Sequence, residues 1–140
     1  MSDQITRAEI TDMFRDKLAQ MFSDRSGTYW PAQFAVCDDG HEADPESPCY
    51  SKPLPPDRTI TGLPDPEHIV AQKVLSIDDV QFVGNGAVSC QCYLTAADGT
   101  GVCSRIIILD NEDNPLAVAT FPVEVLNSQK SFKHIVTFQF

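Results

Sequence analysis

Residues 80–94 read Val80-Gln81-Phe82-Val83-Gly84-Asn85-Gly86-Ala87-Val88-Ser89-Cys90-Gln91-Cys92-Tyr93-Leu94. After the central Gly-Asn-Gly, apolar side chains recur at every second position, which is the period of a β-strand with one buried face. Glycine and asparagine tolerate the positive φ angles that a tight hairpin turn requires. The stretch therefore predicts a β-hairpin, and the rest of the fold is expected to extend from it.

Three more strands are predicted after this hairpin. They cover residues 103–109, 116–125 and 132–140, and the connections at 96–101 and 110–115 are rich in turn-forming residues. Strands joined by short turns are typical of an antiparallel sheet. We therefore expect a five-stranded antiparallel meander.

An amphipathic helix is predicted near the N-terminus. The motif Thr6-Arg7-Ala8-Glu9 matches a capping box, in which Thr and Glu satisfy backbone amides of the first turn. Apolar side chains then recur at three- and four-residue steps, at Ile10, Met13, Phe14, Leu18, Met21 and Phe22. We expect this face to pack on the concave side of a curved sheet, which makes the fold class α+β with a cone-like shape.

A proline-rich segment separates the helix from the hairpin. Eight of the ten prolines fall within residues 28–66, where regular structure should be sparse. A segment of this length serves as a lid, a partner-binding loop or a disordered insertion. Residues 66–76 then favour a short helix, because Asp65 can cap it and Pro66 suits its first turn; a strand over 70–75 is the alternative.

Length and charge narrow the class of protein. A chain of 140 residues fits one domain with a single core, here residues 1–140. Twenty acidic against ten basic residues give a net charge of −10, which repels nucleic acid and anionic membranes. We see no signal peptide or membrane span, so a cytoplasmic protein is expected, and the five cysteines are interpreted as reduced thiols.

The hairpin region resembles a known superfamily. Residues 76–88, Tyr93-Leu94-Thr95, the Asp98-Gly99 turn and residues 106–111 look like the C-terminal sheet of the NTF2-like superfamily, which includes the SnoaL and ketosteroid isomerase types. The resemblance implies an apolar pocket between sheet and helix, and a homodimer formed through the open sheet face. It also implies isomerisation, cyclisation or dehydration without a cofactor.

His134 is the first candidate for a catalytic residue. It shares a strand face with Phe132 and Phe138, which are candidate ligand contacts, and would be desolvated there. Desolvation favours the neutral imidazole, which can act as a base near neutral pH. The alternative is a core histidine that bonds to neighbouring groups.

A second cluster of reactive side chains lies at Cys37-Asp38-Asp39-Gly40-His41, with Cys49 beyond. Asp38 and His41 are candidate proton-transfer groups at the mouth of the pocket. Two thiols and an imidazole are side chains that bind zinc. However, their spacing matches no zinc knuckle, and a fourth ligand such as His68 is distant in sequence. We therefore expect no metal, with a zinc site and a disulfide between the two cysteines as alternatives.

The remaining candidates are expected to bind a ligand without reacting with it. Tyr29, Trp30 and Phe34 form an aromatic group that can line a pocket or pack in the core. Arg105 lies in an apolar strand, where it can orient an anionic or carbonyl ligand or form an ion pair. Cys90, Cys92 and Cys103 are interpreted as small buried hydrophobic residues, with a redox pair as the alternative.

Two functional hypotheses follow from the sequence. The first is a SnoaL-like protein that binds an apolar or polyketide-like small molecule. It either only binds this molecule or acts on it as a cofactor-free isomerase, cyclase or dehydratase. The second is a non-catalytic, acidic interaction module, such as an immunity or adaptor protein, that uses residues 37–66. No phosphate-binding loop or nucleophile elbow occurs, which sets aside kinase-like and α/β-hydrolase functions.

Overall fold

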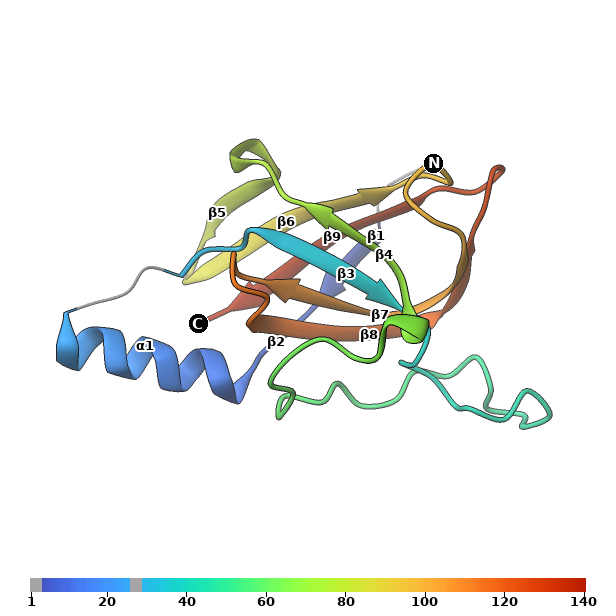
Figure 1. Cartoon of the computed structure of the whole chain (residues 1–140), viewed down its shortest axis with the longest axis horizontal. Helices are drawn as coiled ribbons and strands as arrows, with labels where there is room; N and C mark the ends of the chain where they lie inside the picture. The colour runs from blue at the N-terminus through green and yellow to red at the C-terminus, as the bar shows by residue number, and fades with distance from the viewer. Residues whose placement is uncertain (1–3, 26–28) are drawn as a thin grey trace.

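The structure is a computed structural model that describes residues 4–25 and 29–140 (Figure 1). In this part of the chain, β-strands are the main elements and one α-helix accompanies them. The strands are β1 (Gln4–Arg7), β2 (Glu9–Ile10), β3 (Gln33–Cys37), β4 (Ile69–Val74), β5 (Val80–Gly84), β6 (Ala87–Leu94), β7 (Gly101–Leu109), β8 (Pro115–Leu126) and β9 (Phe132–Gln139). The helix α1 is Asp12–Asp24, and single 3-10 turns span Pro66–His68 and Ile77–Asp79. The predicted α+β class is confirmed.

The strands form two sheets that enclose the main core. One sheet has the order β1-β9-β6-β5 and the other β2-β8-β7-β3-β4 (Figure 1). Only β1 and β9 run parallel; the other described neighbours are antiparallel. Residues of both sheets, such as Cys92 and Val136 from one and Phe34 and Ile106 from the other, pack together in the same cluster. The hydrophobic burial that drives folding is therefore shared between the sheets.

The predicted hairpin is confirmed, but the single meander is wrong. β5 pairs with β6 around a turn in which Gly84, Asn85 and Gly86 all have positive φ. β7 pairs with β8 as expected, whereas β6 pairs with β9 and the connection after β6 crosses to the other sheet. Alternating side chains identify a strand and its buried face, but they do not identify the strand's neighbours.

The helix begins later than predicted. Its N-cap is Thr11, whose side chain accepts a hydrogen bond from the Phe14 amide at 3.1 Å. Thr6 instead lies in β1, so the predicted capping box is wrong. The expected burial of the whole apolar face is also wrong, since Phe14 is the buried residue of the helix and Phe22 is 79% exposed. α1 contacts β8, and its C-terminal end extends away from the sheets (Figure 1).

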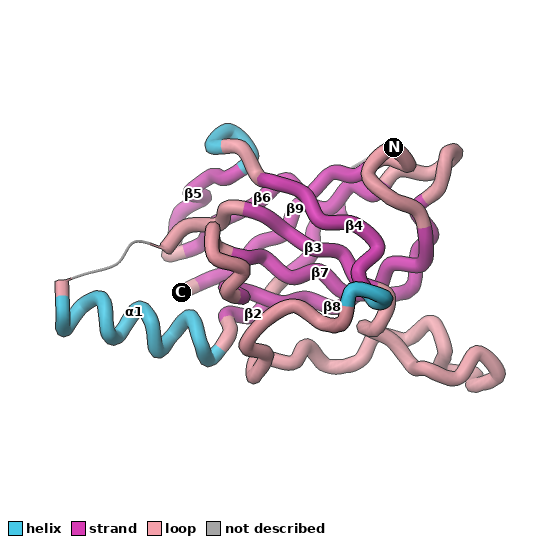
Figure 2. Tube along the Cα trace, viewed as in Figure 1, coloured by secondary structure: helices cyan, strands magenta, loops and turns pink. Residues whose placement is uncertain are grey.

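The proline-rich segment is partly regular. Residues 33–37 form β3, which lies between β7 and the edge strand β4. Residues 38–65 form irregular loop apart from an isolated bridge (Figure 2). Part of this loop covers the outer face of the sheet, where Ile60 and Leu63 pack against Cys37 and Ile107. At 66–76 the predicted helix is wrong and the alternative strand is correct, because β4 follows a single 3-10 turn.

None of the helices in 4–25 and 29–140 has the length and apolarity needed to cross a bilayer.

Candidate functional site

Two of the three histidines line one cavity of about 580 Å³ beside the proline-rich loop. Its walls come from the end of β3, the following loop, the 3-10 turn before β4, and β7. The lining residues are Asp38, Asp39, His41, Glu42, Ala43, Tyr50, Leu54, His68 and Val102. Such a volume suits a small organic molecule.

Strand register brings Asp38 and His68 together. β3 ends at Cys37, which pairs with Ile69 at the start of the antiparallel β4. Asp38, which follows Cys37, therefore faces His68, which precedes Ile69. The Asp38 amide donates to the His68 carbonyl at 3.0 Å. Their side chains also bond, with His68 Nδ1 2.9 Å from Asp38 Oδ1. An Asp–His pair is thus held by main-chain and side-chain bonds at a sheet edge.

His41 is held by a different partner. The Gly40 amide donates to Ser104 Oγ at 2.8 Å, and Ser104 Oγ lies 2.7 Å from His41 Nδ1. The His41 ring packs edge-on against Tyr50 at 4.8 Å between centroids. His41 is 8% exposed, and its Nε2 has no hydrogen-bond partner within residues 4–25 and 29–140. That nitrogen is the ring position left for a ligand.

The bonds at Nδ1 bear on the tautomer of each imidazole. A carboxylate only accepts, so Asp38 places the proton of neutral His68 on Nδ1. His68 Nε2 then carries a lone pair, and it lies 3.7 Å from Glu67 Oε1. Ser104 Oγ accepts from the Gly40 amide and can either donate to His41 Nδ1 or accept from it, because a hydroxyl has one proton and two lone pairs. Donation by Ser104 leaves the proton of neutral His41 on Nε2.

Acidic neighbours favour the protonated form of His68. The hydrogen bond that His68 donates to Asp38 is the main cause that raises the pKa of His68 above its usual value, and desolvation opposes it. Arg105 Nη2 donates to Asp39 Oδ2 at 2.9 Å, and its Nε lies 2.9 Å from Oδ1 without the alignment of a hydrogen bond. Arg105 therefore forms an ion pair at the cavity edge, which was the alternative to orienting a ligand.

The structure does not support the zinc and disulfide alternatives. Within the described ranges no three His, Cys, Asp or Glu side chains converge as metal ligands would, and Cys37 and Cys49 are both free thiols. Burial raises the pKa of Cys37 to about 12, which disfavours the thiolate that a metal or a disulfide exchange requires.

The other buried cysteines show the same chemistry. Burial raises the pKa of both Cys90 and Cys103 to about 12, and that of Cys92 also lies well above its usual value. All three are free thiols within the core cluster. They behave as small apolar side chains, which agrees with the first interpretation of the sequence.

The structure places His134 in the core, away from the His41–His68 cavity. Its side chain is 1% exposed, and both ring nitrogens have partners: Thr6 Oγ1 at 2.7 Å and Glu124 Oε2 at 3.0 Å. The ring stacks on Phe132 at 4.0 Å and packs against Phe121. The predicted desolvation is present, but no ring nitrogen is left for a substrate.

The other predicted ligand contacts are divided between two places. Tyr29, Trp30 and Phe138 line an apolar cavity of about 300 Å³ next to α1 and β5. Phe34 and Phe132 are core residues. Of all the predicted site residues, only Asp38 and His41 line the His41–His68 cavity, and Arg105 lies at its edge.

Sequence reasoning missed three members of this site. From the sequence, His68 was a candidate only for a metal ligand. Its position at the end of a turn, directly before a strand, could have identified it as a residue at a sheet edge. Tyr50 and Ser104 carried no signal, because a tyrosine in a loop and a serine in a strand are common. Their roles depend on contacts between residues that are distant in sequence.

Comparison of the chain with family models, with curated proteins and with solved structures found no match. The resemblance to the NTF2-like superfamily therefore stays a prediction from the sequence. The function proposed next rests on the geometry of the His41–His68 cavity.

Proposed function

We propose that the protein binds a small carbonyl-containing molecule in the His41–His68 cavity and moves a proton on it without a cofactor. One observation carries the proposal: two imidazoles, held by Asp38 and Ser104 at 2.9 and 2.7 Å, line the same cavity. In the proposal His68 is the base and His41, with its proton on Nε2, is the hydrogen-bond donor. Positioned acid–base pairs of this kind accelerate proton transfer by roughly 10²–10⁴-fold.

The two rings have complementary roles. His68 Nε2 removes a proton from the carbon next to the carbonyl, and Asp38 stabilises the imidazolium that forms. His41 Nε2–H donates to the carbonyl oxygen, where negative charge develops, and the product is the enol or enolate. Return of the proton from the His68 imidazolium to another carbon gives isomerisation. In a substrate with a hydroxyl on the carbon next to the deprotonated one, the enolate expels that hydroxyl, the imidazolium protonates it, and water leaves.

The sequence resemblance supports the same reaction class. NTF2-like enzymes of the SnoaL and ketosteroid isomerase types catalyse cofactor-free isomerisation, cyclisation or dehydration. The proposal therefore includes membership of that superfamily, its cone-like fold and a polyketide-like substrate. The ligand is placed beside the proline-rich loop and not between sheet and helix. Tyr50, Leu54 and Val102 supply the apolar contacts that such a ligand needs.

Hydrogen–deuterium exchange tests the proposal without knowledge of the natural substrate. The protein is incubated in deuterium oxide with a panel of small ketones and hydroxyketones, and loss of the α-proton signal is followed by NMR. We expect exchange of at least one compound, slowed about 100-fold in His68→Gln or His41→Gln. Lys133→Gln, at an exposed residue of β9, is the control and should exchange as the parent does. Equal rates in all four proteins would contradict the proposal.

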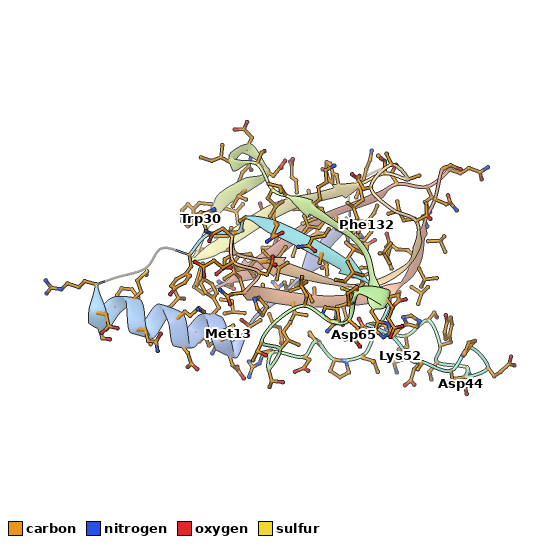
Figure 3. The ribbon with its side chains drawn as sticks, in the orientation of Figure 1. Met13, Trp30, Asp44, Lys52, Asp65 and Phe132 are labelled. Carbon is orange, nitrogen blue, oxygen red and sulfur yellow. The ribbon has the colours of Figure 1, made fainter. Side chains whose placement is uncertain are left out.

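A second candidate function is the acidic interaction module. It is favoured by the loop that extends away from the sheets, where Asp44 lies near the tip (Figure 3). Glu42, Asp44 and Glu46 are all exposed on this loop. A basic protein partner should bind at low salt, dissociate at high salt, and lose affinity for Glu42→Gln/Asp44→Asn/Glu46→Gln. Binding that ignores both salt and these substitutions would contradict this function.

A further inference from the structure

A second cavity, of about 730 Å³, gathers three of the five arginines of the chain. Arg7 lies at the end of β1, Arg15 in the first turn of α1, and Arg58 in the proline-rich loop. The loop is fixed to the helix start because the Asp12 amide donates to the Arg58 carbonyl at 2.9 Å. Three elements that are separate in sequence thus bring arginines to one cavity.

The local charge of this cavity is opposite to that of the molecule. Glu9 is the one acidic residue among its described lining residues, so three arginines and one glutamate give a formal +2. The whole chain carries −10. On a surface with twice as many acids as bases, three arginines with one acid nearby form a positive site that a negative ligand can complement.

Within the part of the chain that the structure describes, these three guanidinium groups are not engaged by other side chains or by the backbone. Within residues 4–25 and 29–140, the side chains of Arg7, Arg15 and Arg58 make no ion pair or hydrogen bond. Arg105, by contrast, pairs with Asp39 at 2.9 Å. All three are exposed and can therefore reorient toward a ligand at little cost in desolvation.

The rest of the cavity is neutral and partly polar. Asn85, Thr137 and Gln139 line it together with Phe138, which is buried. A ligand with an anionic head and a neutral body can therefore place the head at the arginines and the body on β9. The volume lies within the range of small-molecule sites.

We propose that this cavity binds a small polyanion, one that carries phosphate groups or several carboxylates. Planar guanidinium groups bind both kinds of oxyanion through paired hydrogen bonds. The acidic surface outside the cavity disfavours a long polyanion such as nucleic acid, which selects for a small ligand. The site does not depend on the proposed function, because its lining residues are distinct from those of the His41–His68 cavity.

Calorimetric titration at low ionic strength tests the site, with pyrophosphate and citrate as probes. We expect saturable binding of one equivalent of at least one probe, weakened about tenfold by Arg15→Gln or Arg58→Gln alone. Arg7→Gln/Arg15→Gln/Arg58→Gln should abolish saturable binding. The stronger probe identifies the class of anion that the site prefers.

A matched triple variant controls for charge. Lys52→Gln/Lys130→Gln/Lys133→Gln removes the same charge from exposed residues outside the cavity and should bind as the parent does. In NMR spectra, the amides of residues 84, 85 and 58 should shift with the probe. Three outcomes would overturn the proposal: no saturable binding of either probe, equal weakening by both triple variants, or tighter binding of a single-stranded oligonucleotide than of either probe.

Discussion

The bond between His68 and Asp38 should be measurable at the level of one residue. Because Asp38 raises the pKa of His68, Asp38→Asn should lower that pKa toward the ordinary 6.5, as followed by NMR titration of the ring. A raised folded-state pKa stabilises the protein below the unfolded value, and this stabilisation is lost as the pH rises through the folded value. Asp38→Asn should therefore lower the unfolding free energy at acidic pH, where His68 is protonated, and leave it unchanged above the folded-state pKa of His68. An unchanged titration would contradict the bond.

His134 should matter for stability and not for the His41–His68 cavity. His134→Phe leaves Thr6 and Glu124 without their buried partner, so we expect a loss of about 2 kcal/mol in unfolding free energy by chemical denaturation. Adding Thr6→Val and Glu124→Leu removes the unpaired groups as well and should recover part of that loss. Two results would contradict this role of His134. One is an unfolding free energy of His134→Phe equal to that of the parent, and the other is a folded His134→Phe protein that no longer catalyses α-proton exchange.

The residue scale also shows what the sequence could predict about the site. Asp38 and His41 were predicted because their side chains stand close together in a loop with unusual composition. The burial of His134 followed from its strand face. Its partners could not be predicted, because Thr6 comes from a parallel strand 128 residues away and was assigned to a helix cap.

Among the elements, the loop after β3 depends on one close backbone approach. A Cβ atom added at Gly40 would clash with the Ser104 carbonyl oxygen. Gly40→Ala should therefore displace the loop, destabilise the protein by about 2 kcal/mol and slow α-proton exchange, because His41 follows directly. Gly62→Ala is the control, since nothing lies within 4 Å of its Cβ position. Equal thermal stability of both variants would contradict this constraint.

Most strands could be located from the sequence, but their arrangement could not. The period of two in residues 80–94 and 132–140 identified β5, β6 and β9, and positive φ angles at Gly84, Asn85 and Gly86 explain the turn. β3 was missed as a strand because prolines surround it. The division into two sheets depends on β6–β9 and β3–β7 pairing, which is long-range and carries no local signal.

At the scale of the whole molecule, we predict a homodimer, as the resemblance implies. Its support in the structure is β5, a sheet-edge strand on which Phe82 and Val83 are 77% and 53% exposed. Exposed apolar residues on an edge strand are typical of self-association. Sedimentation velocity should give twice the mass of one chain, and Phe82→Asp should give a monomer while Val125→Asp, on β8, does not. A monomeric parent would contradict the prediction.

The central claim is that His41 and His68 act on one ligand cavity while His134 does not. The three histidines are the only ones in the chain, so their ring signals can be assigned by single substitutions and followed together by NMR. The measurement adds the ketone that exchanges fastest and records the three rings. We predict that the signals of His41 and His68 shift with the same saturation curve and that those of His134 stay constant. A shift of His134 alone, or of none of the three rings, would contradict the assignment of this cavity as the functional site.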